Sequence, residues 1–310
     1  MILVTGGTGF IGQALIRQLI SHGEEVRTLV RPSQKSPHLP KGVPVDVVVS
    51  SLLDERGVRA AMRGVDAVYH LVTGENKGSK TNLIETDIQP AQVVTNAAKD
   101  SGVKRLIYLS HLGADRASAF PALKAKGIAE YHIKNSGIDY TILRSGLVYG
   151  PDDHFTEGLR IVMRLLPFIL LIPDDGKTVI QPIWVDDLVN SLIWCLEDDK
   201  TINQVIEIGG SETISLRVIC ETIQDRIGAK NVITGINPAY LRLLTMTLES
   251  MAPVFPLSTF WLDYLAADRT CAIDSLPRNF GIIPAIFKQK LDYLSARKPV
   301  QSKLKRVRSL

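Results

Sequence analysis

The sequence predicts an α/β fold in which helices cover both faces of a doubly wound parallel sheet, followed by a smaller, mainly helical cap. Two observations predict it. Short runs of β-branched residues alternate with amphipathic helical patterns through the first half of the chain, and parallel strands need such crossovers between them. The first strand also leads directly into a glycine-rich turn and a helix. With 310 residues, 45% of them hydrophobic and 22% charged, the chain can bury a sizeable core.

The first half contains six predicted strands and four predicted helices. The strands are short runs rich in β-branched residues: Ile2–Thr5, Val26–Val30, Val45–Val49, Ala67–Leu71, Arg105–Ser110 and Tyr140–Arg144. The helices between them have apolar residues three and four positions apart: Gly12–His22, Glu55–Met62, Ile88–Ser101 and Leu123–Ser136. Three glycines stand where helix C-caps are expected: Gly23, Gly102 and Gly137.

After Gly150-Pro151 the alternation becomes irregular, although no flexible linker marks a boundary. An apolar stretch, Leu159–Leu171, has helical spacing, and strand-like runs are expected at Gln181–Val185 and Val205–Ile208. The remaining predicted elements of this half are helices: Asp186–Glu197, Leu216–Ile227, Tyr240–Glu249 and Phe287–Ala296. We interpret this half as an interleaved cap.

The turn after the first strand reads Thr5-Gly6-Gly7-Thr8-Gly9-Phe10-Ile11-Gly12, which places glycines in a GxxGxxG pattern. The first glycine permits a tight turn, the second lets a pyrophosphate approach the backbone, and the third lets the helix pack close to the strand. The helix N-terminus then offers N–H groups to phosphates. This strand–turn–helix context predicts a Rossmann-type dinucleotide site formed by Thr5, Gly6, Gly9, Phe10, Ile11 and Gly12.

The end of the second strand predicts which nicotinamide cofactor is preferred. An acid there binds the ribose 2′-hydroxyl of NAD, whereas an arginine accommodates the 2′-phosphate of NADP. The chain reads Val30-Arg31-Pro32-Ser33-Gln34-Lys35, without a carboxylate. Arg31, Ser33 and Lys35 can hold a phosphate through charge-assisted hydrogen bonds, and the alternative is that Arg31 is a solvated surface residue. We predict that NADPH is preferred over NADH.

Five segments together resemble the extended or atypical short-chain dehydrogenases/reductases: Thr5–Gly12, Asp66–Val72, Gly102–Ser110, Gly137–Gly150 and Ile183–Leu188. The resemblance covers nearly the whole chain. It is closest to the group containing NmrA-like redox sensors, isoflavone-reductase-like enzymes, epimerase/dehydratase-like proteins and the accessory NAD(P)H-binding subunit of respiratory complex I. It implies that Ser110 is the family serine and that four further residues contact the cofactor: Leu71, Val72, Gly146 and Val148.

The chain departs from this family where a catalytic tyrosine and a lysine normally stand four residues apart on a helix. If Lys124 is the family lysine, the tyrosine position is Phe120; if it is Lys126, that position is Ala122. We favour Lys126, because Glu130 follows at the spacing that the family shows. Either way the tyrosine hydroxyl is lost, and a positioned general acid is worth about 10²–10⁴-fold in rate.

The remaining candidates for chemistry are Ser110 and Lys126. In isoflavone-reductase-like relatives a lysine at the matching place exchanges the proton, so Lys126 either performs this step with a lowered pKa or only holds the nicotinamide ribose. His111 either shuttles protons or is a satisfied core residue. We therefore expect an NADPH-dependent oxidoreductase that reduces an apolar small molecule. The alternative is a non-catalytic NADPH-binding redox sensor, or an accessory or assembly factor of a membrane redox complex.

The division expected from these features is an NAD(P)-binding domain at residues 1–155, a cap with returning strand segments at 156–296 and a basic tail at 297–310. The tail carries six Lys and Arg and no acids, whereas residues 1–296 carry 30 Lys and Arg against 32 Asp and Glu. Because the basic charge is confined to the tail, we expect no nucleic-acid partner. The apolar run Ile161–Ile172 is a pocket wall, a partner or membrane interface, or a packed segment.

The sequence also carries expectations about location. No signal peptide and no apolar run of the length of a bilayer span is recognisable. Three widely spaced cysteines, Cys195, Cys220 and Cys271, argue against a disulfide framework or a zinc site. We therefore expect a cytoplasmic protein without a metal, with attachment to a membrane surface through the cap and tail left open.

Overall fold

The computed structural model describes residues 1–33, 36–75, 78, 81–251 and 258–295. Its centre is a seven-stranded sheet in the order β11-β6-β5-β4-β1-β2-β3, in which all neighbours are parallel. The predicted fold class is therefore confirmed. The strands are β1 (Ile2–Thr5), β2 (Val26–Val30), β3 (Asp46–Val49), β4 (Ala67–His70), β5 (Arg105–His111), β6 (Tyr140–Ser145) and β11 (Gln204–Ile208).

The order of the strands reverses between β1 and β4. From β1 the chain moves outward through β2 to β3, then crosses back to β4 and continues outward on the other side. The two strands pair from Ile2 and Ala67 to Thr5 and His70. In open α/β sheets, ligands bind outside the carboxyl ends of the strands at such a reversal. The topology therefore places a binding site beside Thr5 and His70.

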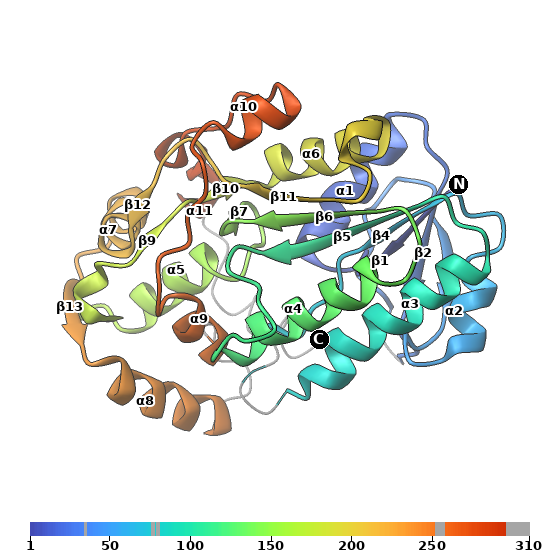
Figure 1. The fold of residues 1–310 in the computed structure, drawn as a ribbon. Coiled ribbons are helices and arrows are strands. Elements are labelled where there is room, and N and C mark those ends of the chain that lie inside the picture. Colours follow the sequence, from blue (N-terminus) through green and yellow to red (C-terminus); the bar gives the residue numbers. More distant parts are fainter. Residues whose placement is uncertain (34–35, 76–77, 79–80, 252–257, 296–310) are drawn as a thin grey trace.

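Helices cover both faces of this sheet because successive strand residues point to opposite sides. Leu3 and Leu106 belong to the core under α2 (Glu55–Ala61), α3 (Gln89–Asp100) and α4 (Pro121–Lys134). Their neighbours Val4 and Ile107 belong to the opposite core, under α1 (Phe10–Ser21) and α6 (Val185–Glu197). Figure 1 shows the two groups of helices on the two sides of the sheet, with the strands pointing toward the cap.

The cap is built around its own apolar core at the carboxyl end of the sheet (Figure 1). Short two-stranded sheets hold it together: β7 pairs with β10, β9 with β12 and β8 with β13. The strands are β7 (Val148–Tyr149), β8 (Ile169–Pro173), β9 (Val179–Ile180), β10 (Ile183–Trp184), β12 (Ile214–Ser215) and β13 (Val232–Ile236). The helices of the cap are α5 (Thr156–Leu165), α7 (Leu216–Ile227), α8 (Pro238–Met251), α9 (Thr259–Tyr264) and α11 (Asp292–Ser295). The short helix α10 (Ser275–Phe280) packs instead on the sheet core beside α6, to which it contributes Leu276.

Two predicted cap helices are wrong in part. The stretch Leu159–Leu171 is not one helix, since α5 ends at Leu165 and β8 begins at Ile169. Pro167 lies between them, and proline both lacks an N–H and excludes the helical conformation before it. The predicted helix Phe287–Ala296 is a 3₁₀ turn, Phe287–Lys290, followed by the four residues of α11. Within the described ranges, no helix is long and apolar enough to cross a membrane.

Candidate functional site

The backbone of the glycine turn packs tightly against itself and against the segment that follows β4. Gly6 has a φ of 81°, and a Cβ there would lie 3.1 Å from the Leu71 carbonyl carbon. The N–H of Gly9 donates to the Gly6 carbonyl at 3.0 Å. A Cβ on Gly12 would lie 2.2 Å from that same oxygen, so only glycine lets α1 start this close to β1.

The amino end of α1 is open to an anion. Its N-cap, Gly9, supplies no side-chain hydrogen bond, and the first turn contains no acid. The first N–H groups of a helix have no partner within the helix, and its dipole favours negative charge there. The amides of Phe10 and Ile11 therefore stand where a pyrophosphate fits.

The end of β4 runs alongside this turn. Leu71 donates its N–H to the Thr5 carbonyl at 3.1 Å, and a Cβ on Gly6 would lie 3.2 Å from the Val72 nitrogen. The structure thus brings Leu71 and Val72 together with the glycine turn, as the sequence predicts for the cofactor site.

Arg31 follows β2 directly and is exposed. The residues after it, Pro32 and Ser33, are also exposed, and none of the three is acidic. Lys35, the third member of the predicted phosphate clamp, lies outside the described residues. Arg31 is therefore placed at the strand end that faces the adenine ribose in a Rossmann-type fold.

The structure distinguishes the two candidate lysines of α4. Lys124 is exposed, whereas Lys126 is only 3% exposed. The Lys126 ammonium donates to the Leu109 carbonyl at 3.3 Å, lies 3.9 Å from the Asp87 carboxylate and stands 5.1 Å above the Tyr108 ring. Burial and these contacts favour Lys126 over Lys124 as the lysine of the predicted site, and Ala122 lies four residues before Lys126.

The charge on Lys126 is stabilised. Burial lowers the pKa of a lysine, but the phenol of Tyr108 and the carboxylates of Asp87 and Glu75 outweigh burial and raise the pKa of Lys126. The environment therefore opposes the lowered pKa that a lysine-based proton transfer requires. Lys126 is an ammonium that can hold ribose hydroxyls.

Ser110 is fully buried, with its hydroxyl donating to Glu130 at 2.7 Å. Glu130 also accepts two hydrogen bonds from Arg144, at 3.0 and 2.7 Å. Ser110 thus points under α4 and belongs to a network that joins β5, α4 and β6. Because successive side chains of a strand point to opposite faces of the sheet, the side chain of His111 points to the face opposite that of Ser110.

His111 forms a partly buried pair with Glu75, a residue that the sequence analysis did not single out. The His111 Nε2 and Glu75 Oε1 atoms are 2.5 Å apart, and Thr73 donates its hydroxyl to the same oxygen at 2.6 Å. Burial alone would raise the pKa of Glu75, but His111 outweighs burial and lowers this pKa to about 2. The other ring nitrogen of His111, Nδ1, is buried and has no hydrogen-bond partner among the described residues.

His70 and Asp87 complete the polar lining. The His70 Nδ1 atom lies 2.7 Å from the Thr5 hydroxyl, and its ring stacks on Tyr108 with centroids 5.7 Å apart. Burial lowers the pKa of His70 to about 3. Asp87 stands on a π-helical turn, Ile84–Ile88, and accepts from the Gly74 N–H at 2.9 Å; such turns are frequent at functional sites.

Sequence signals for these missed residues are weak. His70 ends β4, so its strand-end position alone marks it. Glu75 and Asp87 lie in irregular segments, and nothing in their spacing links them to Lys126.

The cap adds an aromatic wall. Phe260 and Tyr264 of α9 each lie 5.8 Å from the His111 ring. The Arg269 guanidinium lies 5.6 Å from the Tyr264 ring and 5.9 Å from the Phe120 ring. Phe120, the other candidate for the tyrosine position, is therefore part of this wall and donates no proton.

Gly146 and Val148 lie just after the end of β6, where the chain enters the cap. Gly146 donates its N–H to the Ile208 carbonyl at 2.9 Å, and a Cβ there would lie 2.2 Å from the Gln181 carbonyl oxygen. Val148 pairs with Ile183 through β7 and β10. These two residues anchor the returning strand beside the sheet.

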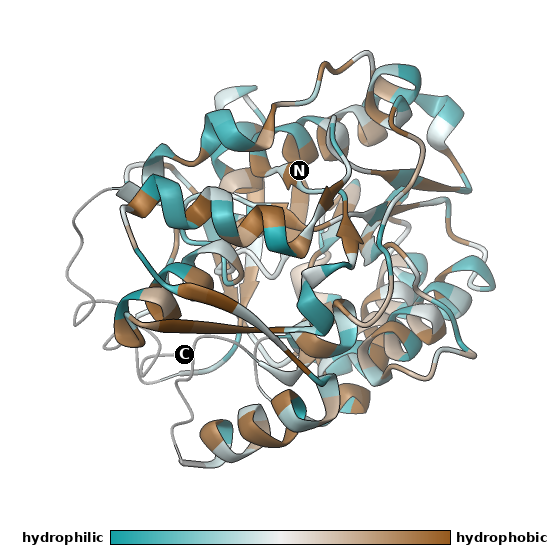
Figure 2. Ribbon diagram, turned by 90° about the vertical axis from the view of Figure 1, so that its left-hand side faces the viewer, coloured by the Kyte–Doolittle hydropathy of each residue, from teal (hydrophilic) through white to brown (hydrophobic). Residues whose placement is uncertain are grey.

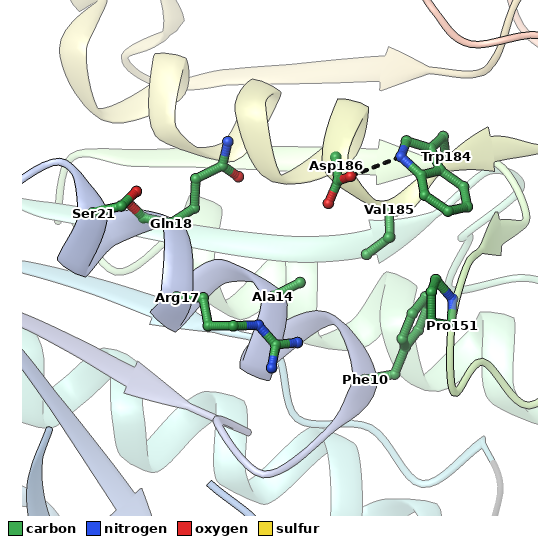
Figure 3. A pocket seen from close by; sticks show the side chains of 9 residues that line it. All are labelled: Phe10, Ala14, Arg17, Gln18, Ser21, Pro151, Trp184, Val185 and Asp186. Atoms are coloured by element: carbon green, nitrogen blue, oxygen red, sulfur yellow. Dashed lines mark hydrogen bonds between the residues drawn. The ribbon is translucent and has the colours of Figure 1, made fainter. Parts of the chain in front are cut away.

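A separate cavity of about 330 Å³ opens between α1 and the start of α6. Figure 3 shows Arg17 of α1 and Asp186 of α6 among its lining residues, with the Trp184 indole donating to Asp186. The cavity shares only Phe10 with the predicted cofactor residues. We assign it no role in the site at the strand ends.

The residues present fit a nicotinamide dinucleotide. The uncapped helix start suits a pyrophosphate, and the buried Lys126 ammonium suits a ribose. A buried polar atom nearby, His70 Nε2, has no hydrogen-bond partner in the described part of the chain. The family model described as NAD(P)H-binding matches residues 6–165, over half of the chain.

The chain belongs to the NAD(P)H-binding family.

Relatives of this NAD(P)H-binding chain include an enzyme and a subunit of a respiratory complex. It is 29% identical to "NADH dehydrogenase [ubiquinone] 1 alpha subcomplex subunit 9, mitochondrial" from Arabidopsis thaliana, over 72% of this chain and 57% of the relative. It is 25% identical to 2-alkyl-3-oxoalkanoate reductase from Stenotrophomonas maltophilia, over 92% of this chain and 95% of the relative.

Solved structures share the fold. The UDP-glucose 4-epimerase of Thermus thermophilus, in complex with NAD, superposes with a TM-score of 0.71 at 20% identity, covering 95% of this chain and 97% of that one. The fold of the NAD(P)H-binding chain is thus that of an epimerase-like short-chain dehydrogenase/reductase.

Proposed function

We propose that the chain is an NADPH-dependent reductase of apolar carbonyl compounds, with His111 in place of the missing tyrosine as proton donor. The observation that carries the proposal is the partly buried His111–Glu75 pair, with His111 Nε2 and Glu75 Oε1 2.5 Å apart, at the carboxyl end of β5. The reduced nicotinamide, when bound, supplies the hydride for the carbonyl carbon. The protein must then supply a proton to the carbonyl oxygen.

The pair is arranged for that transfer. Glu75, with its pKa lowered to about 2, is a carboxylate at neutral pH and accepts the Nε2 proton of His111. The partner fixes which nitrogen remains available, as in other histidines held by a carboxylate. A second proton on the imidazole then sits on Nδ1, which has no hydrogen-bond partner within the described ranges. Transfer from Nδ1 to the carbonyl oxygen yields the alcohol, and solvent returns the proton to His111.

Lys126 acts as the ribose clamp in this proposal. Its pKa is raised by its surroundings, so it remains charged, and Asp87 at 3.9 Å compensates that charge. The two residues hold the cofactor and donate no proton to the substrate. Ser110 does not contact the substrate in this proposal, because its hydroxyl donates to Glu130.

NADPH rather than NADH is the proposed cofactor. The support is the exposed Arg31 at the end of β2, with no acid in the next two residues. A guanidinium pairs bidentately with a phosphate, whereas a ribose hydroxyl is usually held by a carboxylate at this point. We place the reaction in the cytoplasm, as the sequence predicts.

The test is a steady-state assay of NADPH oxidation against quinones, enones and aldehydes with apolar chains. His111→Gln is expected to lower kcat by about 100-fold or more, because the proton donor is removed, while NADPH affinity is retained. His22→Gln is the matched control, since His22 is exposed at the far end of α1. Equal turnover by the wild type and His111→Gln refutes His111 as the donor.

A second candidate is a non-catalytic NADPH-binding accessory protein. It is favoured by the packing of His111 against Phe260 and Tyr264 of the cap and by the similarity to a subunit of NADH dehydrogenase. Tight NADPH binding without oxidation by any member of the panel supports this candidate and rejects the reductase.

A further inference from the structure

We propose that the tip of the cap formed by Leu165, Leu166, Phe168, Ile169 and Val232 docks the protein on an anionic phospholipid surface. This tip lies at the amino ends of β8 and β13, away from the carboxyl ends of the main sheet. The proposal does not depend on whether the cofactor site is catalytic.

The tip exposes large apolar side chains in one continuous group. Phe168 is 84% exposed and Val232 65% exposed. Leu165, Leu166 and Ile169 are each exposed as well. Ile169 and Val232 are paired residues of neighbouring strands, so the two segments form one surface. Contiguous apolar patches of this kind mark interaction sites in soluble proteins.

The exposed conformation is held by hydrogen bonds. Val232 donates its N–H to the Phe168 carbonyl at 2.9 Å, and Leu166 donates to Val162 at 2.9 Å. The buried side chain of Asn231 donates to the carbonyls of Met163 and Leu166. A buried amide thus ties the tip to the cap, which keeps its apolar side chains outward.

Figure 2 faces the cap and colours each residue of the ribbon by its hydropathy. The strands β8 and β13 appear as brown ribbons above α8, the lowest helix. On α8, Tyr240, Leu243 and Leu244 are also exposed. Exposed apolar residues are therefore present on α8 as well as at the tip.

Charge favours a lipid surface over a protein partner of mixed charge. From Arg164 to Pro173 and from Lys230 to Leu248 the chain has three basic residues and no acid, and one of the three, Arg242, is paired with Asp263 of α9. Arg164 and Lys230 flank the tip. Basic residues close to an anionic membrane contribute about 1 kcal/mol each, and apolar side chains add to this when they insert at the interface.

The last described residue of the chain contacts the end of α7, the helix that precedes β13. Ser295, the last described residue, donates its hydroxyl to the Arg226 carbonyl at 3.1 Å. Arg226 precedes Lys230 by four residues at the end of α7, and Val232 follows. Residues 297–310, which follow Ser295 in the sequence, contain six Lys and Arg and no acid. Stable membrane attachment commonly combines an apolar anchor with a polybasic segment.

The experiment is flotation of the full chain with vesicles of phosphatidylcholine containing about one third phosphatidylglycerol, compared with pure phosphatidylcholine. The wild type should bind the anionic vesicles, less so at high salt. Phe168→Ser should weaken binding about 10-fold, because an inserted aromatic side chain is lost. Ile283→Ser is the matched control, since Ile283 is 89% exposed and lies outside the tip.

Melting temperature and NADPH titration establish that each variant is folded. Failure of the wild type to bind anionic vesicles overturns the proposal, as does equal binding to both kinds of vesicle. Equal binding by the wild type and Phe168→Ser also overturns it, because the tail alone then accounts for attachment. If the wild type is a dimer in solution, binds no vesicles, and Phe168→Ser is a monomer, the tip is instead a contact between two copies.

Discussion

The two ends of the cofactor site are built in different ways. At the glycine turn, recognition comes from backbone: seven consecutive residues, Gly6–Gly12, form a close turn followed by an uncapped helix start. At the Lys126 end, recognition comes from side chains delivered by separate segments, with Asp87, Glu75 and His111 around the lysine. The glycine turn depends on residues without side chains, whereas the Lys126 end depends on charged side chains that lie close together.

This difference has energetic consequences. A turn of backbone amides carries no ionisable group, so its limits are steric. Buried charges must be paired, and removing one partner leaves the other uncompensated. Substitutions at the glycine end should therefore act through space and independently of pH, whereas those at the Lys126 end should act through charge.

The largest effect is expected for Gly12→Ala. Its Cβ would lie 2.2 Å from the Gly6 oxygen and 2.8 Å from the Gly7 Cα, so α1 must move away from β1. We expect a loss of about 3 kcal/mol in the free energy of unfolding and no NADPH binding, measured by urea denaturation and titration. Gly9→Ala is the control, since its Cβ would lie 3.3 Å from the same oxygen. Equal destabilisation by both substitutions contradicts the steric argument.

The next effect is a pH dependence from His70. Its pKa of about 3 in the folded protein lies below the ordinary 6.5. Below pH 6.5 the unfolded chain therefore binds a proton that the folded protein does not, and stability falls as the pH falls. From pH 7 to 5 this loss should be about 2 kcal/mol. In His70→Gln the decline over this interval should be smaller by that amount; an unchanged decline assigns it to other groups.

Lys126→Met tests the charged end directly. Loss of a charge-assisted hydrogen bond should weaken NADPH binding about 30-fold, which corresponds to about 2 kcal/mol. Lys124→Met, at an exposed position of the same helix, should leave the dissociation constant unchanged. A similar loss in both variants means that α4 contributes only general positive charge.

The smallest effect is expected for Arg31→Ala at the adenine ribose. NADPH binding should weaken about 10-fold, and NADH binding should be unaffected, because only NADPH carries the 2′-phosphate. Isothermal titration with both cofactors measures this. An equal loss for NADH assigns Arg31 to the common part of the cofactor.

The same contrast explains what was predictable from the sequence. The strands of the sheet and the turn at Gly6–Gly12 are local patterns, and the structure contains them. The direction of the Ser110 side chain could not be predicted from local sequence. Ser110 bonds Glu130 of α4, whereas the next residue of β5, His111, bonds Glu75. The pairing of Asp87 and Glu75 with Lys126 depends on crossovers that bring distant segments together. In the cap, apolar spacing alone did not reveal that Pro167 separates α5 from β8.

Titration of the full chain with NADPH and with NADH, compared under identical conditions, tests the central claim most directly. The account predicts binding of one NADPH per chain, with an affinity about 10-fold or more above that of NADH. Comparable affinities contradict the assignment of Arg31, and absence of binding by both contradicts the assignment of the site.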